Sequence, residues 1–90
     1  MHIRQDGEVD SELVNVRKSE REEVIWFSDS DEFSVNFPTS PFKDQTFHVP
    51  AGGSVKSGPV RLNAPIYQYQ YFITNVALAK SADSGLNAKP

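Results

Sequence analysis

The chain has 90 residues, no cysteine and a formal net charge of −3, from twelve acidic and nine basic side chains. This length is enough for one domain and too short for two, and the lack of cysteine excludes a disulfide framework and cysteine-ligated zinc, iron–sulfur or blue-copper sites. Lys and Arg are not clustered as nucleic-acid binding requires, and no apolar run reaches the ~18 residues that span a bilayer.

The first third of the chain predicts two strands joined by a charged turn. Leu13–Val16 alternates weakly, with its two valines on one face. Ser19 and Glu22 have the spacing of a helix capping box, but no apolar stripe accompanies them, so we expect a turn. Val24–Phe27 is apolar on both faces, as expected for a central strand.

The middle of the chain predicts two more strands, separated by a proline-bounded loop. Phe33–Phe37 follows the polar turn Asp29–Asp31 and alternates with period two, which places Phe and Val inward and Ser and Asn outward. The loop is Pro38–Asp44, and Thr46–Val49 is the short strand after it. Two glycine-containing turns follow, Ala51–Ser54 and Ser57–Pro59.

The last third predicts the longest strand and a polar tail. Tyr67–Thr74 places its three tyrosines on one face and its two glutamines and Phe72 on the other. Val76–Ala79 either continues this strand or begins the next one. The tail from Ser81 to Pro90 is polar and small, and we expect it to be loose at its end.

Strand signals therefore recur every ~8–12 residues without a convincing helix, as in a sandwich or barrel. The predicted fold class is all-β: an antiparallel Greek-key β-sandwich of about six to eight strands. We expect a single domain over residues 1–90, with its core at about residues 10–88 and frayed termini.

Four features occur in a characteristic order: a hydrophobic strand through Trp26, the Phe33–Phe37 strand, the segment Phe47–Val55, and the tyrosine-rich strand late in the chain. This order resembles the cupredoxin-like fold, a plastocyanin-type β-sandwich, and especially its small bacterial members that lack copper. The tail Asp83-Ser84-Gly85-Leu86 resembles the Asp-Pro-Gly-aliphatic ending of such relatives, with Ser84 in place of Pro.

The resemblance also implies where copper ligands would stand. Copper-binding members carry one His after the second core strand, and a Cys, a second His and usually a Met around the end of the late aromatic strand. Phe33 falls near the first position and Tyr71 at the cysteine, and residues 72–90 contain neither His nor Met. We therefore expect a copper-free scaffold without a cofactor, in which aromatic side chains fill the space of the metal.

No other metal or catalytic site is predicted. His48 should point away from the apolar face of its strand, and His2 lies in a terminus expected to be frayed. The cluster Asp29–Glu32 could attract Ca²⁺ but lacks the Gly and distal Glu of an EF-hand, so we expect a turn whose Asp side chains cap backbone amides. No Ser lies in a nucleophile motif, and no spacing singles out a catalytic carboxylate pair, so we expect no enzyme.

The expected function is that of a small monomeric binding or structural module. Recognition would use the loops at one end of the sandwich (Asp29–Glu32, Pro38–Asp44 and Ser57–Pro65) or an exposed strand edge. The partner would be a protein or a carbohydrate, and neither a nucleic acid nor a membrane. The candidate surface residues are Asp29, Asp31, Glu32, Phe42, Tyr67, Tyr69 and Tyr71.

The alternative is a carbohydrate-binding module that stacks sugars on exposed tyrosine rings. Alternation of the tyrosines with glutamine favours instead a row that faces the core, because Gln is rarely buried. The first seven residues lack the apolar segment of a signal peptide. We therefore expect a cytoplasmic protein, or a periplasmic or secreted one if a leader has been removed.

Overall fold

A computed structural model describes residues 1–4, 9 and 13–90. These residues form eight β-strands and no helix, which confirms the predicted all-β class. The strands are β1 (His2–Ile3), β2 (Leu13–Arg17), β3 (Ile25–Ser28), β4 (Phe33–Asn36), β5 (Thr46–Val49), β6 (Ser54–Lys56), β7 (Gln68–Asn75) and β8 (Lys80–Lys89).

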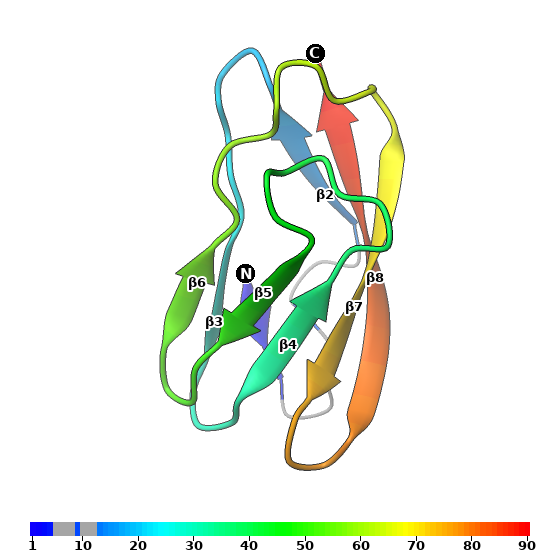
Figure 1. The fold of residues 1–90 in the computed structure, drawn as a ribbon. Coiled ribbons are helices and arrows are strands. Elements are labelled where there is room, and N and C mark those ends of the chain that lie inside the picture. The colour runs from blue at the N-terminus through cyan, green and yellow to red at the C-terminus, as the bar shows by residue number, and fades with distance from the viewer. Residues whose placement is uncertain (5–8, 10–12) are drawn as a thin grey trace.

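The strands build two sheets that pack face to face as a sandwich (Figure 1). The smaller sheet has the order β1-β3-β6, and the larger sheet has the order β2-β8-β7-β4-β5. The pairs β1–β3 and β2–β8 are parallel, and the other pairs are antiparallel. Both parallel pairs join segments distant in sequence, where no hairpin imposes an antiparallel direction. The sequence pattern did not predict them.

The two faces of the larger sheet follow from period-two alternation. In β7 the side chains of Tyr69, Tyr71 and Ile73 are buried, whereas Gln68 and Gln70 are exposed. The apolar residues of β4 and β5 are buried in the same way, and their polar neighbours are not. One face therefore packs on the smaller sheet and the other faces solvent.

The core is an aromatic cluster that joins the two sheets. Trp26 of β3 contacts Phe47 of β5 and Tyr71 of β7, with ring centroids 5.4 and 5.7 Å apart. Phe37 stacks on Tyr71 at 4.8 Å, and Phe42 packs edge-on against Phe37 at 5.6 Å. Large aromatic side chains bury much area per residue, which suits a small domain without disulfides.

The prediction of a loose tail is wrong. The segment lies in β8, the longest strand described, which is hydrogen-bonded between β2 and β7. Leu86 and Ala88 face the core at 0% and 1% exposure, and Asn87 between them faces outward and donates to Asn15. Two apolar side chains give a weak sequence signal, but β8 is held by backbone pairing with β7 over residues 80–87 and with β2 over residues 85–89.

The segment Val76–Ala79 is the turn between β7 and β8, and neither a continuation of β7 nor the start of β8. The buried side chain of Asn75 builds this turn, because its Oδ1 accepts hydrogen bonds from the Ala77 and Leu78 amides, each at 3.1 Å. Ala79 closes the turn with φ of 55° and donates its amide to the Asn75 carbonyl oxygen.

At the other expected irregular segments, one prediction holds and one fails. The predicted charged turn is confirmed at residues 18–21. By contrast, His2 and Ile3 are not frayed: they form β1 beside β3, and the amide of Phe27 donates to the carbonyl oxygen of Met1. Burial of Ile3, at 2% exposure, holds this strand in place.

Candidate functional site

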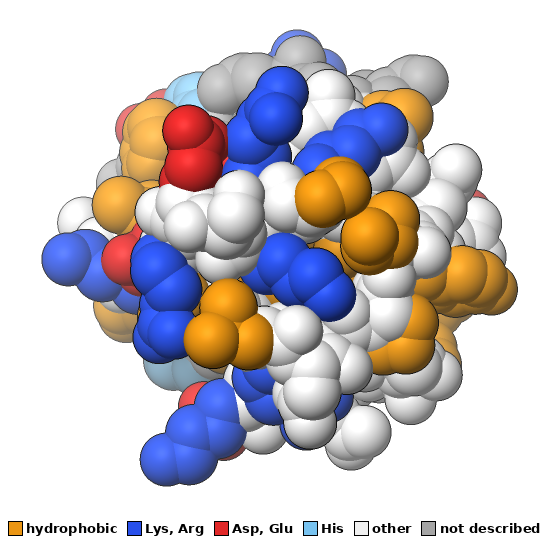
Figure 2. Space-filling model, turned by 90° about the horizontal axis from the view of Figure 1, so that it is seen from above, with side chains coloured by type: hydrophobic (Ala, Val, Ile, Leu, Met, Phe, Trp, Pro, Cys, Tyr) orange, Lys and Arg blue, Asp and Glu red, His pale blue; other side chains and the backbone are white. Residues whose placement is uncertain are grey.

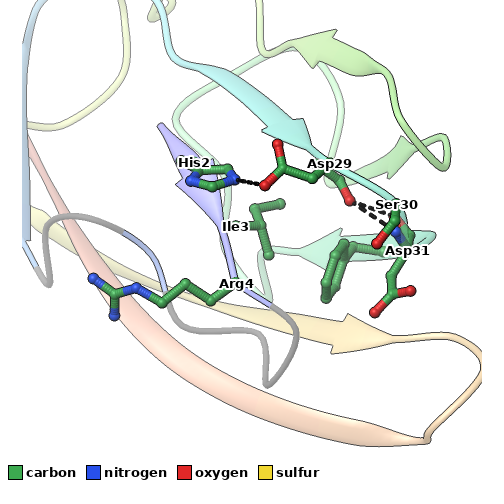
Figure 3. Close-up of a pocket in the computed structure, with 8 residues that line it drawn as sticks. His2, Ile3, Arg4, Asp29, Ser30 and Asp31 are labelled. Carbon is green, nitrogen blue, oxygen red and sulfur yellow. Dashed lines mark hydrogen bonds and ion pairs between the residues drawn. The ribbon is translucent and has the colours of Figure 1, made fainter.

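The acidic turn lies at the lower end of the sandwich in Figure 1, beside a cavity of about 330 Å³ (Figure 3). There His2 Nε2 lies 2.8 Å from Asp29 Oδ2, and the His2 ring stacks on Phe27 at 5.1 Å. Asp31 accepts a hydrogen bond from Asn75 Nδ2 at 3.1 Å. The carboxylates that line this cavity are therefore engaged by neighbouring side chains.

The turn itself is confirmed, but its capping group differs from the expected one. The Ser28 hydroxyl, and not an Asp side chain, accepts the Asp31 amide at 3.2 Å and donates to the Asp31 carbonyl oxygen at 2.5 Å. On the far side of the turn, His48 Nε2 lies 2.9 Å from Glu32 Oε2. The His48 side chain points outward as predicted.

The His–carboxylate pairs at this turn do not form a metal centre within the described residues. No group of three or more His, Cys, Asp or Glu side chains is placed there to hold an ion. The same residues contain no helix with the length and apolarity needed to cross a membrane.

The three candidate loops do not meet at one end of the sandwich. Asp29–Glu32 lies at the lower end in Figure 1, and Pro38–Asp44 and Ser57–Pro65 lie at the upper end. The Arg61 guanidinium joins the upper two by donating to the Ser40 carbonyl oxygen at 3.0 Å. The strand directions separate the loops, since β3 and β4 meet at the opposite end from β4 and β5.

The upper end carries exposed apolar side chains among basic ones. Leu62, Ile66 and Tyr67 are 62%, 57% and 63% exposed. Lys18 Nζ holds their loop by donating to the carbonyl oxygens of Leu62 at 3.2 Å and Ala64 at 2.7 Å. Figure 2, which looks onto this end, shows hydrophobic side chains interspersed with Lys and Arg.

Three of the candidate surface residues are wrong because they are buried. Phe42, Tyr69 and Tyr71 are at most 3% exposed. Phe42 turns inward because the Ser40 hydroxyl accepts its amide and bends the loop. The tyrosine row faces the core as its alternation with Gln favours, and only Tyr67, which precedes β7, is exposed.

The buried tyrosines differ in how their hydroxyls are satisfied. Tyr69 Oη donates to the Pro65 carbonyl oxygen at 2.9 Å. Tyr71 Oη and Trp26 Nε1 are buried without a hydrogen-bond partner among the described residues. Burial raises the pKa of the Tyr71 phenol, and the polar groups of Trp26 and Ser84 oppose part of this rise. Burial likewise raises the pKa of Tyr69.

The residues at the expected copper-ligand positions are both in the core but on different rows of the sheet. Phe33 pairs with Asn75, whereas Tyr71 lies four residues before Asn75 along β7 and stacks on Phe37. Phe33 and Tyr71 are at most 1% exposed.

A groove of about 380 Å³ lies on the outer face of the larger sheet, over β7, β8 and the start of β2. Its floor is Gly85, which pairs with Gln70 on one side and Leu13 on the other. Because Gly85 has no side chain, the sheet surface is depressed between these neighbours. We call this depression the Gly85 groove; its lining residues are Leu13, Gln68, Gln70, Asp83, Ser84 and Gly85.

Three polar side chains of the Gly85 groove have no partner among the described residues, whereas several polar side chains around the groove are paired. Elsewhere on the outer face, Thr46 donates to Asn36, Asn87 donates to Asn15, and Thr74 and Ser81 share a hydrogen bond at 2.9 Å. Gln68, Gln70 and Asp83 make no side-chain hydrogen bond or ion pair with any residue that the structure describes.

Phe72 extends the groove along β7. It is 39% exposed and pairs directly with Asp83 across the two strands. The expected apolar spot on the glutamine face is therefore present, and it adjoins a free carboxylate. The sequence analysis missed the groove itself. Its signal was Gly85, since a glycine inside a strand marks a bulge or a place that something else approaches closely.

Comparisons with protein-family models, with curated proteins and with solved structures found no match to this chain.

Proposed function

We propose that this chain is a small non-catalytic binding module that recognises a glycan in the Gly85 groove. The observation that carries the proposal is the concentration of amide and carboxylate groups without a described partner around an open groove, on a face where three pairs of polar side chains bond to one another. The volume of about 380 Å³ lies within the range of small-ligand sites.

A glycan suits the chemistry of this face better than a peptide does. The groove lies on the face of the sheet, from which side chains and not backbone groups project, and β8 pairs with β7 at Asp83 and Ser84 and with both β7 and β2 at Gly85. Amide groups donate and accept at once, as sugar hydroxyls do. Phe72 and Leu13 provide apolar surface for the C–H faces of a sugar ring. Extended peptides instead use the free backbone of a sheet edge.

This proposal takes up the carbohydrate function that the sequence offered as the alternative, but moves it to the opposite face of the sheet. The stacking ring becomes Phe72, because Tyr69 and Tyr71 are in the core. We further propose that the scaffold is a copper-free Greek-key member of the cupredoxin-like type. The absence of cysteine and the burial of Phe33 and Tyr71 support that assignment.

Protein recognition through the end loops is the second candidate, favoured by the exposed Leu62, Ile66 and Tyr67. It ranks lower because the acidic turn lies at the other end and its carboxylates are already paired. A ligand of the acidic turn would have to break these pairs, whereas a ligand of the Gly85 groove would not.

The test is a screen of neutral oligosaccharides on a glycan array, followed by NMR shift mapping and calorimetry with the best binder. We expect shift changes at Gln68, Gln70, Phe72 and Gly85. Changes confined to the loop with Leu62, or no binding by any glycan, would contradict the proposal.

A substitution at the floor separates binding from folding. Gly85→Thr should reduce affinity at least about tenfold by filling the groove. The same change should leave the free energy of unfolding equal or raise it by up to about 1 kcal/mol, because Gly85 has no positive φ and Gly is unfavourable inside a strand. Ser81→Thr is the matched control, on the same strand and face about 13 Å away.

A further inference from the structure

We infer that Asp83 makes the Gly85 groove selective for amino sugars that carry a protonated amine, over their N-acetylated and acidic counterparts. This inference rests on the glycan-binding function proposed above and adds a class of ligand to it. It concerns the charge of the preferred ligand, which the proposed function leaves open.

Asp83 is the one charged side chain that lines the groove, and no cation among the described residues neutralises it. Its carboxylate is exposed and forms no ion pair there. The residues paired with Asp83 in succession across β7, β4 and β5 form one row of outward side chains. They are Phe72, Asn36 and Thr46, and all are uncharged. The next row runs from Ser81 across the same strands to His48. His48 is its one ionisable side chain among the described residues, and it is paired with Glu32.

The basic side chains that the structure describes on the outer face lie too far away to compensate. Arg17 and Lys89 pair with each other at the opposite end of β2 and β8. Lys89 is six residues from Asp83, which is about 20 Å along a strand. That separation is about twice the Debye length at physiological salt. Among the described side chains, none therefore compensates the negative charge that a ligand meets in the groove.

The position of Asp83 beside Phe72 suits a substituent of a stacked sugar. Directly paired residues of neighbouring antiparallel strands have their Cβ atoms about 5 Å apart on the same face. A ring that stacks on Phe72 would thus bring an equatorial amine next to the Asp83 carboxylate. An acetyl group removes the positive charge, and a carboxyl group on the sugar would be repelled.

The test compares hexamers of glucosamine, N-acetylglucosamine and galacturonic acid at mildly acidic pH, where the free amines are protonated. Calorimetry should show about fivefold tighter binding of the glucosamine hexamer than of the N-acetylated one, the upper range for an exposed ion pair. The galacturonic acid hexamer should bind more weakly than both. Added salt should reduce the difference.

Asp83→Asn should abolish the preference and leave binding of the N-acetylated hexamer within about twofold. Asp44→Asn is the matched control, because it removes the same charge from an exposed residue outside the groove. If Asp44→Asn abolishes the preference as well, the net negative charge of the chain causes it, and the assignment to Asp83 fails.

The remaining outcomes separate this inference from the proposed function. Groove binding of neutral glycans without any preference for the amine would overturn the inference and leave the function intact. Absence of binding by every glycan would overturn both. Binding of a lysine-rich peptide in place of glycans, lost in Asp83→Asn, would identify the groove as a peptide site and would also overturn both.

Discussion

Removal of the Tyr71 hydroxyl should stabilise the protein, contrary to the usual effect of a Tyr→Phe substitution. The Tyr71 ring is fully buried between Trp26 and Phe37, and its hydroxyl makes no hydrogen bond of ordinary geometry with a described residue, although weaker contacts with Trp26 and Ser84 lower its pKa in part. Phe fills the same ring volume without carrying an unsatisfied polar atom into the core.

The magnitude follows from the cost of burying a polar group. An unsatisfied buried donor or acceptor costs about 1–3 kcal/mol, whereas a hydroxyl that makes a typical hydrogen bond contributes about 1 kcal/mol. We therefore expect Tyr71→Phe to raise the free energy of unfolding by about 1 kcal/mol. Tyr69→Phe, which loses the bond to the Pro65 carbonyl oxygen, should lower it by about 1 kcal/mol.

The pH dependence of the free energy of unfolding provides a second test of the burial of Tyr71. Burial raises the pKa of Tyr71 above that of an unfolded chain, where tyrosine titrates near 10. Above that pH the unfolded state releases the proton and the native state retains it. The free energy of unfolding therefore falls as pH rises through this range, by at most about 1.4 kcal/mol per pH unit for one tyrosine. Tyr71→Phe should remove this contribution and leave that of Tyr69.

Urea unfolding followed by circular dichroism, at neutral pH and in steps above pH ~10, measures both effects. Tyr69→Phe serves as the internal control, because it changes the same atom in the next inward-facing residue of the same strand. A loss of 1 kcal/mol or more in Tyr71→Phe at neutral pH would refute the reasoning. It would mean that the hydroxyl makes a favourable bond in the native state.

Two further substitutions test the turn between β7 and β8. Asn75→Ala should lower the free energy of unfolding by about 2–4 kcal/mol, because it removes a fully buried side chain that bonds to two amides and to Asp31. Urea unfolding measures this change, and a loss under 1 kcal/mol would contradict the role of Asn75. Ala79→Gly should raise the melting temperature, because a φ of 55° costs about 1 kcal/mol of backbone strain for Ala and almost none for Gly. A lower melting temperature would show that the strain is smaller than the added chain entropy.

Local alternation was sufficient to predict the strands with strong apolar periodicity. Phe33–Phe37 and Thr46–Val49 were expected within one residue of β4 and β5, and the inward direction of Tyr69 and Tyr71 followed from their glutamine neighbours. These predictions hold because side chains alternate across a strand whatever its partners are.

Features that depend on which strands pair could not be predicted from the sequence. β8 has only Leu86 and Ala88 as strongly buried apolar residues, so its central place depends on hydrogen bonds from β2 and β7. The parallel pairing of β1 and β3 brings His2 to Asp29, twenty-seven positions away in the chain. Such contacts arise from topology, which local patterns do not encode.

The candidate site shows the same division. By itself the sequence determined that cysteine chemistry is absent, that Gln68, Gln70 and Phe72 share one face, and that the late strand turns its tyrosines inward. Only the tertiary structure placed Gly85 between Gln70 and Leu13 and set Asp83 beside Phe72. The physical reason is register: alternation fixes the face on which a side chain lies, and pairing between strands distant in the chain fixes its neighbours there.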